Sequence, residues 1–120
     1  MPAPRQFFRR TVQKAAVGGT FDDVEFAPPV EHSFTQITRA AFEDETNAPS
    51  SIRLVVVGHG DVYMLNEQDP GAADVLYQDV DGTWITDGEK LVARFFGATA
   101  ADVLKLYVEG WTEPLGPEPV

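Results

Sequence analysis

The stretch that decides the fold of this chain is residues 82–111, GTWITDGEKLVARFFGATAADVLKLYVEGW. Two apolar runs, 91–96 and 103–108, flank a loop of mostly small residues. In both runs the residue type alternates, and successive side chains of a β-strand point to opposite faces, so each run predicts a half-buried strand. The loop 97–102 then predicts that the two strands pair as a hairpin. The side chains that we expect in the core are Phe95, Leu104 and Leu106.

A short helix is the competing interpretation of the second run. Thr99 and Asp102 have the spacing of a helix capping box, and residues 100–107 are long enough for two turns. The valines and the tyrosine of this run prefer strands, and Gly110 ends it quickly. Such a helix would also expose apolar residues around most of its circumference. The balance favours a strand.

Length and composition place the chain among single globular domains. It has 120 residues, of which 43% are hydrophobic, and it has no cysteine. This length allows a real core without disulfides or metals. The missing cysteine excludes disulfides, thiolate metal sites and a cysteine nucleophile. No apolar run approaches the roughly 18 residues of a membrane span, and no signal peptide is recognisable, so we expect a soluble protein without a membrane partner.

The charge is strongly acidic but unevenly distributed. The net charge is −10, yet residues 1–14 hold four bases and no acid. An acidic body disfavours non-specific binding to nucleic acid, so no nucleic-acid partner is expected. The basic N-terminal segment suits an acidic partner, including the body of another copy. The alternative is that these bases only solubilise a chain terminus.

The rest of the chain has the short apolar segments and regularly spaced turn residues of an all-β protein. Residues 52–57, IRLVVV, are the best candidate for a central strand, and Asp81-Gly82 has the composition of a tight hairpin turn. Seven or eight short strands, separated by turn signals about every ten residues, predict a β-sandwich, a jelly roll or a small barrel.

Proline and charge divide the chain into three parts. Residues 1–31 end in a segment that contains Pro28-Pro29, and paired prolines do not fit a central strand. We therefore expect an extended N-terminal arm at 1–31, a β-sandwich body at 32–111 and a proline-rich C-terminal tail at 112–120. If the arm is separate, deletion of residues 1–17 should leave a folded body.

No stretch of the sequence carries a catalytic motif. His59 and Asp61 could hold a metal or act as acid and base, but the neighbouring glycines favour a β-turn. Residues 79–82 resemble the start of a calcium loop, but the glycine comes too early and the expected strand resumes at once. The acidic residues 43–45 are explained by a solvated loop. We expect no enzyme activity and no catalytic, cofactor-binding or metal-binding residue.

Aromatic side chains are the remaining candidates for function. Tyr63, Tyr77, Trp84, Tyr107 and Trp111 could form a sugar-stacking or protein-contact surface, although core packing explains most of them. Tyr107 and Trp111 alternate with the predicted core leucines, so they should point away from the core. Arginine and aromatic residues are enriched at interface hot spots. The predicted interface consists of Arg5, Phe7, Phe8, Arg9, Arg10, Tyr107 and Trp111.

Residues 52–111, with VVVGHGDVYMLNEQD and GEKLVARFFGATAADVLKLYVEGW, resemble small β-sandwich virion proteins of tailed bacteriophages. The resemblance covers about half of the chain and implies a capsid-decorating, head–tail connector or neck component of the virion. It implies that the partners are copies of the chain and other virion proteins, and it assigns no functional residues. The alternative is a carbohydrate-binding module. A cupin-like enzyme is disfavoured because two histidines are too few for its usual metal site.

Overall fold

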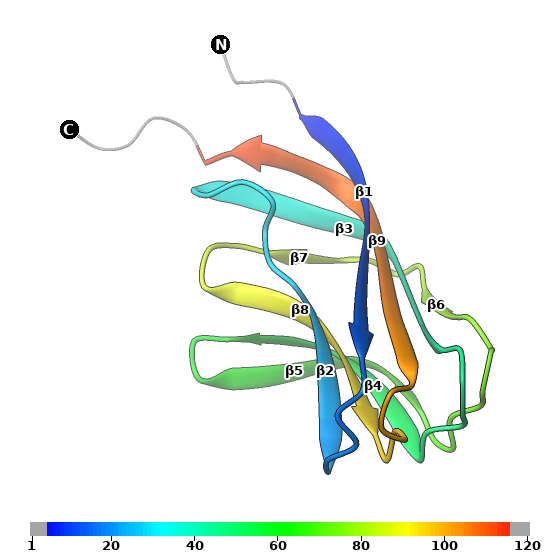
Figure 1. Cartoon of the computed structure of the whole chain (residues 1–120). Helices are drawn as coiled ribbons and strands as arrows, with labels where there is room; N and C mark the ends of the chain where they lie inside the picture. Colours follow the sequence, from blue (N-terminus) through cyan, green and yellow to red (C-terminus); the bar gives the residue numbers. More distant parts are fainter. Residues whose placement is uncertain (1–4, 116–120) are drawn as a thin grey trace.

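The computed structural model describes residues 5–115, and every regular element in this range is a β-strand (Figure 1). The strands form two antiparallel sheets, an arrangement compatible with the expected β-sandwich. The nine strands of these residues are β1 (Gln6–Ala15), β2 (Phe21–Phe26), β3 (Ser33–Asp44), β4 (Ser51–Gly58), β5 (Asp61–Gln68), β6 (Tyr77–Asp79), β7 (Thr83–Ile85), β8 (Glu89–Phe96) and β9 (Val103–Pro114). No helix in this range is long and apolar enough to cross a membrane.

The two sheets enclose one hydrophobic core. The first sheet, here called sheet A, has the order β1-β9-β3-β6, and β7 also pairs with β3. The second, sheet B, has the order β2-β8-β4-β5. Both sheets contribute side chains to the core, among them Phe42 and Leu106 from sheet A and Leu54 and Phe95 from sheet B. The predicted central strand 52–57 falls in β4, which lies between β8 and β5.

Strands β8 and β9 confirm the alternation that the sequence predicted, but not their pairing. Phe95, Leu104 and Leu106 are fully buried, as expected, and the helical interpretation of the second run is wrong. The predicted hairpin is also wrong, because β8 belongs to sheet B and β9 to sheet A. Each strand lies between two long partners of its own sheet. The loop 97–102 therefore crosses from one sheet to the other, and six residues easily span the roughly 10 Å between packed sheets.

The N-terminal arm is not confirmed, because most of its described residues form strands of the two sheets. All of β1 pairs with β9, from Gln6 opposite Thr112 to Ala15 opposite Val103. All of β2 pairs with β8. Val24 and Phe26 of β2 are core residues. The prolines 28–29 lie in the connection between β2 and β3, outside any ladder, where their missing N–H groups cost nothing.

The proline-rich tail at 112–120 is not confirmed, because its first residues belong to a strand. Strand β9 continues to Pro114, and its last residues pair with the start of β3, where Pro114 lies opposite Ser33. Thr112, the first residue of the predicted tail, is buried. The remainder of that tail, residues 116–120, lies outside the described residues.

Two turns show how much the local sequence can specify. His59 and Gly60 have φ angles of 52° and 81°, and they join β4 to β5 as a two-residue hairpin, so the predicted turn is confirmed. The predicted hairpin at Asp81-Gly82 is wrong. Strands β6 and β7 do not pair with each other, because both pair with successive parts of β3. They act as one interrupted edge strand of sheet A.

Candidate interaction surfaces

The outer face of sheet A collects most of the predicted interface. Because Leu106 and Val108 of β9 are buried, the alternate residues of β9 point away from the core. The register places Phe7 opposite Trp111, Arg9 opposite Glu109 and Thr11 opposite Tyr107. Residues directly opposite each other across an antiparallel pair share a face. Phe7, Arg9, Tyr107 and Trp111 therefore lie together on this surface, the β1–β9 face.

An aromatic platform forms one end of the β1–β9 face. The guanidinium carbon of Arg5 lies 3.9 Å from the centroid of the Trp111 ring. Phe34 of β3 packs in a tilted arrangement against the same ring, with centroids 5.8 Å apart. Phe7 stands beside this group with 79% of its surface exposed. An exposed phenylalanine next to a tryptophan and an arginine has the composition of a protein-contact hot spot.

The arginines of this face are already paired within the chain. Arg5 Nε lies 3.2 Å from Glu113 Oε2, and Arg9 Nε lies 3.1 Å from Glu109 Oε2. These pairs are exposed and individually contribute little to stability. The two glutamates nevertheless neutralise the charges of the two arginines, so the β1–β9 face is mixed in charge rather than basic.

The other end of this face is polar and ordered by side-chain hydrogen bonds. Tyr107 donates its hydroxyl hydrogen to Glu43 over 2.8 Å, and the pKa of Tyr107 is raised by burial and then by this bond. Lys105 Nζ lies 2.6 Å from Glu45, and the hydrogen bond to this carboxylate raises the pKa of Lys105. Tyr107 is therefore a fixed polar group, whereas Trp111 is the aromatic contact.

The side chains of two of the predicted interface residues do not belong to the outer side of this face. Phe8 points to the inner side of β1 and stacks on Phe26 of β2, with centroids 5.5 Å apart. It is a half-buried core residue. Arg10 shares this inward parity but stays exposed at the sheet edge, where its Nη1 donates to the Arg9 carbonyl oxygen over 3.1 Å. The sequence could not separate them because an edge strand shows no clean period.

The β1–β9 face is hollowed where β3 changes register near Thr38. A depression of about 530 Å³ is lined by Phe7, Phe8, Arg9, Thr38, Glu109 and Gly110. Gly110 is required here, because a Cβ at this position would overlap the carbonyl oxygen of Gln36. The hollow places the exposed Phe7 ring beside a recess, which gives the face a shape that a partner can fill.

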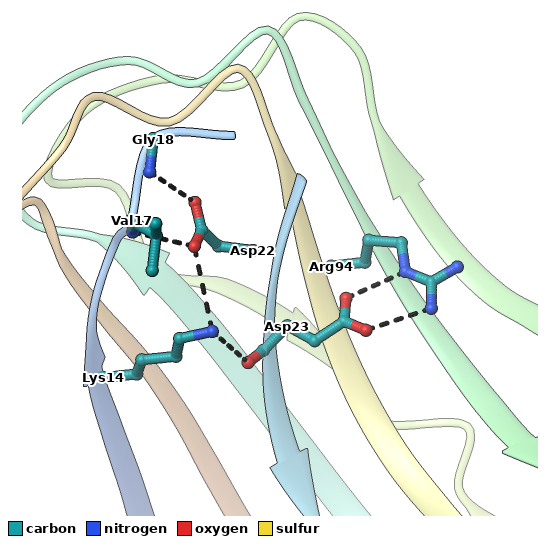
Figure 2. Close-up of polar contacts among 6 residues, drawn as sticks. All are labelled: Lys14, Val17, Gly18, Asp22, Asp23 and Arg94. Atoms are coloured by element: carbon teal, nitrogen blue, oxygen red, sulfur yellow. Dashed lines mark hydrogen bonds and ion pairs between the residues drawn. The ribbon is translucent and has the colours of Figure 1, made fainter. Parts of the chain in front are cut away.

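The side of the molecule where β1 and β2 are the sheet edges is closed by polar contacts (Figure 2). Buried Asp22 of β2 accepts hydrogen bonds from the backbone N–H groups of Val17 and Gly18, over 2.8 and 3.3 Å. Lys14 of β1 reaches across, with Nζ 3.8 Å from Asp22 and 3.4 Å from the Asp23 carbonyl oxygen. The Asp23 carboxylate in turn forms a two-pronged pair with Arg94 of β8, at 2.8 and 3.0 Å. These hydrogen bonds and ion pairs therefore connect the edges of the two sheets on this side of the molecule.

The opposite side, where β5 and β7 are the sheet edges, is open. A cleft of about 820 Å³ lies between them, and its apolar wall includes Val56 and Leu65. Tyr63 and Trp84 line it with 67% and 54% of their surfaces exposed. Polar groups are supplied by His59, Asp61, Thr83 and Glu89. We call this the β5–β7 cleft. By contrast, Tyr77 stacks on Phe42 of the core, as the packing interpretation expected.

A buried pair of carboxyl groups lies where the β3–β4 and β8–β9 connections meet. Asp44 and Asp102 are both buried. Burial raises the pKa of Asp44 to about 6, and the contact with Asp102 adds to the effect. Burial alone would also raise the pKa of Asp102, but hydrogen bonds from Asn47, Asp44 and Thr99 outweigh it, so this pKa is lowered. The expectation of a solvated loop at 43–45 is wrong for Asp44, whose strand parity is that of Phe42.

The residues considered for metal binding form turns in the structure. Asp79 Oδ1 accepts a hydrogen bond from the N–H of Asp81 over 3.0 Å, which is a turn contact. Within residues 5–115 no group of three or more histidine, aspartate or glutamate side chains is placed to hold a metal ion. Comparison with protein-family models finds no match, and no curated protein matches the chain either.

Proposed function

We propose that this protein is a structural assembly protein of a tailed-bacteriophage virion and acts through protein–protein contacts rather than catalysis. Its place would be a capsid-decorating or head–tail connector position, with copies of itself and other virion proteins as partners. The observation that carries the proposal is the β1–β9 face, where exposed Phe7 stands beside Trp111 and a recess. Aromatic side chains that gather in one exposed patch with arginine are typical of protein-contact sites.

We also propose that the two sheets are a jelly roll. The strand pairs support this, because they nest from the outside inwards: β1 with β9, β2 with β8, β3 with β6 and β7, and β4 with β5. Counting β6 and β7 as one interrupted strand gives the eight strands of that fold. Jelly rolls occur in viral capsids but also in lectins and cupins, so the fold alone does not decide the function.

The test compares two equally exposed apolar side chains. Phe7 on the β1–β9 face is 79% exposed, and Val17 in the β1–β2 connection is 76% exposed. We expect Phe7→Ser to weaken association of the chain with itself, or with the proteins encoded beside it, by at least about tenfold, since a central aromatic contact contributes 2 kcal/mol or more. Val17→Ser should have no effect. Sedimentation velocity measures association, and circular dichroism checks that both variants fold.

Two results would contradict this proposal. One is a wild-type chain that stays monomeric at high concentration and in the presence of the proteins encoded beside it. The other is equal association of Phe7→Ser and the wild type, which would move the contact away from the β1–β9 face. The virion location itself is tested by mass spectrometry of purified phage particles from the source of the gene.

A further inference from the structure

We propose that the β5–β7 cleft is a binding site for a neutral oligosaccharide. This site is separate from the assembly surface, because its lining residues come from β4, β5, β7, the first residue of β8 and two connecting turns, and none comes from β1 or β9. The proposal therefore does not depend on the assembly function. Its volume of about 820 Å³ is within the range of small-molecule sites, roughly 300–1,000 Å³.

Two exposed aromatic rings, one from each sheet, are the main argument. Tyr63 belongs to β5 of sheet B and Trp84 to β7 of sheet A, and both line the cleft. Sugar rings present apolar C–H faces that pack against aromatic rings, while the phenol and indole groups keep a polar edge for hydrogen bonding. The core does not need either ring, since each keeps more than half of its surface exposed.

The polar groups of the cleft suit hydroxyl-rich ligands. Asp61 and Glu89 carry carboxylates that accept hydrogen bonds, and His59 and Thr83 add groups that can donate or accept. Glu89 is held in place, because its Oε1 accepts hydrogen bonds from both the N–H and the hydroxyl of Thr86, each at 2.9 Å. A few fixed polar groups in a mostly apolar cleft are what gives a small-molecule site its orientation.

The negative charge of the cleft favours neutral sugars over acidic ones. The cleft contains two carboxylates and no lysine or arginine among its lining residues, and the whole chain has a net charge of −10. Uronic acids and sulfated sugars would be repelled by this field. The ligand class is therefore neutral, including N-acetylated sugars, whose methyl group matches the apolar wall formed by Val56 and Leu65.

The backbone on the β7 side of the cleft is held in place by contacts with β3. Gly82 has a φ of 81°, and a Cβ there would come within 3.0 Å of the Ile37 carbonyl oxygen. The Gln36 side chain donates from Nε2 to the Thr83 carbonyl oxygen over 2.9 Å, which fixes β7 against β3. The Trp84 backbone is thus anchored to sheet A before any ligand arrives. A site with fixed walls loses little ordering entropy on binding.

The experiment uses the two tryptophans as separate reporters. The chain has only Trp84, at the cleft, and Trp111, on the β1–β9 face. The probes are soluble chito-, cello-, malto- and manno-oligosaccharides of three to five units. We expect at least one of them to change the fluorescence of the Trp111→Phe variant and to leave that of Trp84→Phe unchanged. Amide NMR shifts should map to residues 58–65 and 82–89.

Side-chain variants then test the stacking. Tyr63→Ala and Trp84→Ala should each weaken binding of that oligosaccharide by about fivefold or more, because one aromatic stacking contact contributes about 1 kcal/mol beyond its buried area. Phe7→Ser should bind it like the wild type. The same variants separate the two proposals, since Phe7→Ser is the one expected to lose assembly.

Three outcomes would overturn the proposal. One is the absence of any amide shift at 10 mM of every probe. Another is a set of shifts that maps to the β1–β9 face instead. The third is a concentration-dependent shift of the cleft resonances without any sugar, which would make a second copy of the chain the occupant.

Discussion

At the scale of the single residue, Asp44 makes the stability of the protein depend on pH in an unusual direction. Its carboxyl group is fully buried beside Asp102, and its pKa is raised to about 6. A carboxyl group whose pKa is raised in the folded state stabilises most when protonated. Its contribution is complete below the unfolded value of 3.8 and is lost as the pH rises through about 6. As the pH rises from about 4 to 7, the free energy of unfolding therefore falls because this contribution is lost.

The isosteric variant Asp44→Asn tests this dependence. Its amide oxygen can still accept from the N–H groups of Thr46 and Asn47, and its amide nitrogen can replace the proton shared with Asp102. We expect a flatter pH profile and, at pH 8, a free energy of unfolding about 1–2 kcal/mol above that of the wild type. Urea unfolding at pH 5, 6, 7 and 8 measures both. A wild type whose stability rises over this range would contradict the assignment.

The strands show which parts of the fold were visible in the sequence. The alternation of 91–96 and 103–108 predicted β8 and β9 correctly, because both are central strands with one face in the core. The prediction that these two strands form a hairpin was wrong, because a local sequence pattern does not encode which sheet a strand joins. Strand β1 was assigned to an arm rather than to a sheet. One of its edges is open, so polar residues occupy positions that a central strand would fill with apolar ones.

The surfaces were predictable to a similar degree. Tyr107 and Trp111 followed from the parity of β9, and Phe7 and Arg9 joined them through a register that no local pattern contains. Burial of Asp44 had one signal, the continuation of the period of Ala40 and Phe42. For the β5–β7 cleft the sequence offered Tyr63 and Trp84 only as two of five candidate stacking aromatics. It did not indicate that they line one cleft, because they come from different sheets and meet only in three dimensions.

Strand β1 itself is expected to be essential for folding. Deletion of residues 1–17 would remove the strand that pairs with β9 from Val103 to Thr112, and with it Phe8 and Val12, which pack against the core. It would also leave β9 as a long unpaired edge, which promotes aggregation. We expect loss of cooperative unfolding and of the native circular dichroism spectrum. A chain that starts at Arg5 keeps β1 and is the control.

A truncated chain that folds and remains monomeric would restore the arm interpretation. In that case β1 would be a detachable strand, and residues 18–115 would carry their own complete core. Size-exclusion chromatography beside thermal unfolding distinguishes this outcome from aggregation.

At the scale of the whole molecule, charge predicts how assembly responds to salt. Arg5 and Arg9 are already paired with glutamates of the same face, so they offer little net attraction to a second copy. Two copies with a net charge of −10 instead repel each other at long range. Salt screens this repulsion, because the Debye length falls from about 10 Å at 0.1 M to about 3 Å at 1 M.

We therefore expect self-association to strengthen between 50 and 500 mM NaCl. If a basic arm bound the acidic body of another copy, association would instead weaken as salt is added. Sedimentation velocity across this range measures it, and Phe7→Ser provides the baseline without the contact. Association that weakens with salt would show that the arginines exchange their partners for acids of the neighbouring copy.

The pairing of β1 with β9 also governs how quickly the chain can reach its native state. The Arg9–Glu109 contact joins residues 100 positions apart, and β2 meets β8 across about 70. Among the strand pairs of residues 5–115, only β4 and β5 are joined by a tight turn. Proteins dominated by such distant pairings fold in milliseconds to seconds, because the entropy of large loops is lost before the contacts form. We therefore expect β9, whose partners β1 and β3 are both distant in the sequence, to pair late in folding, and until then Leu104 and Leu106 stay accessible to other chains.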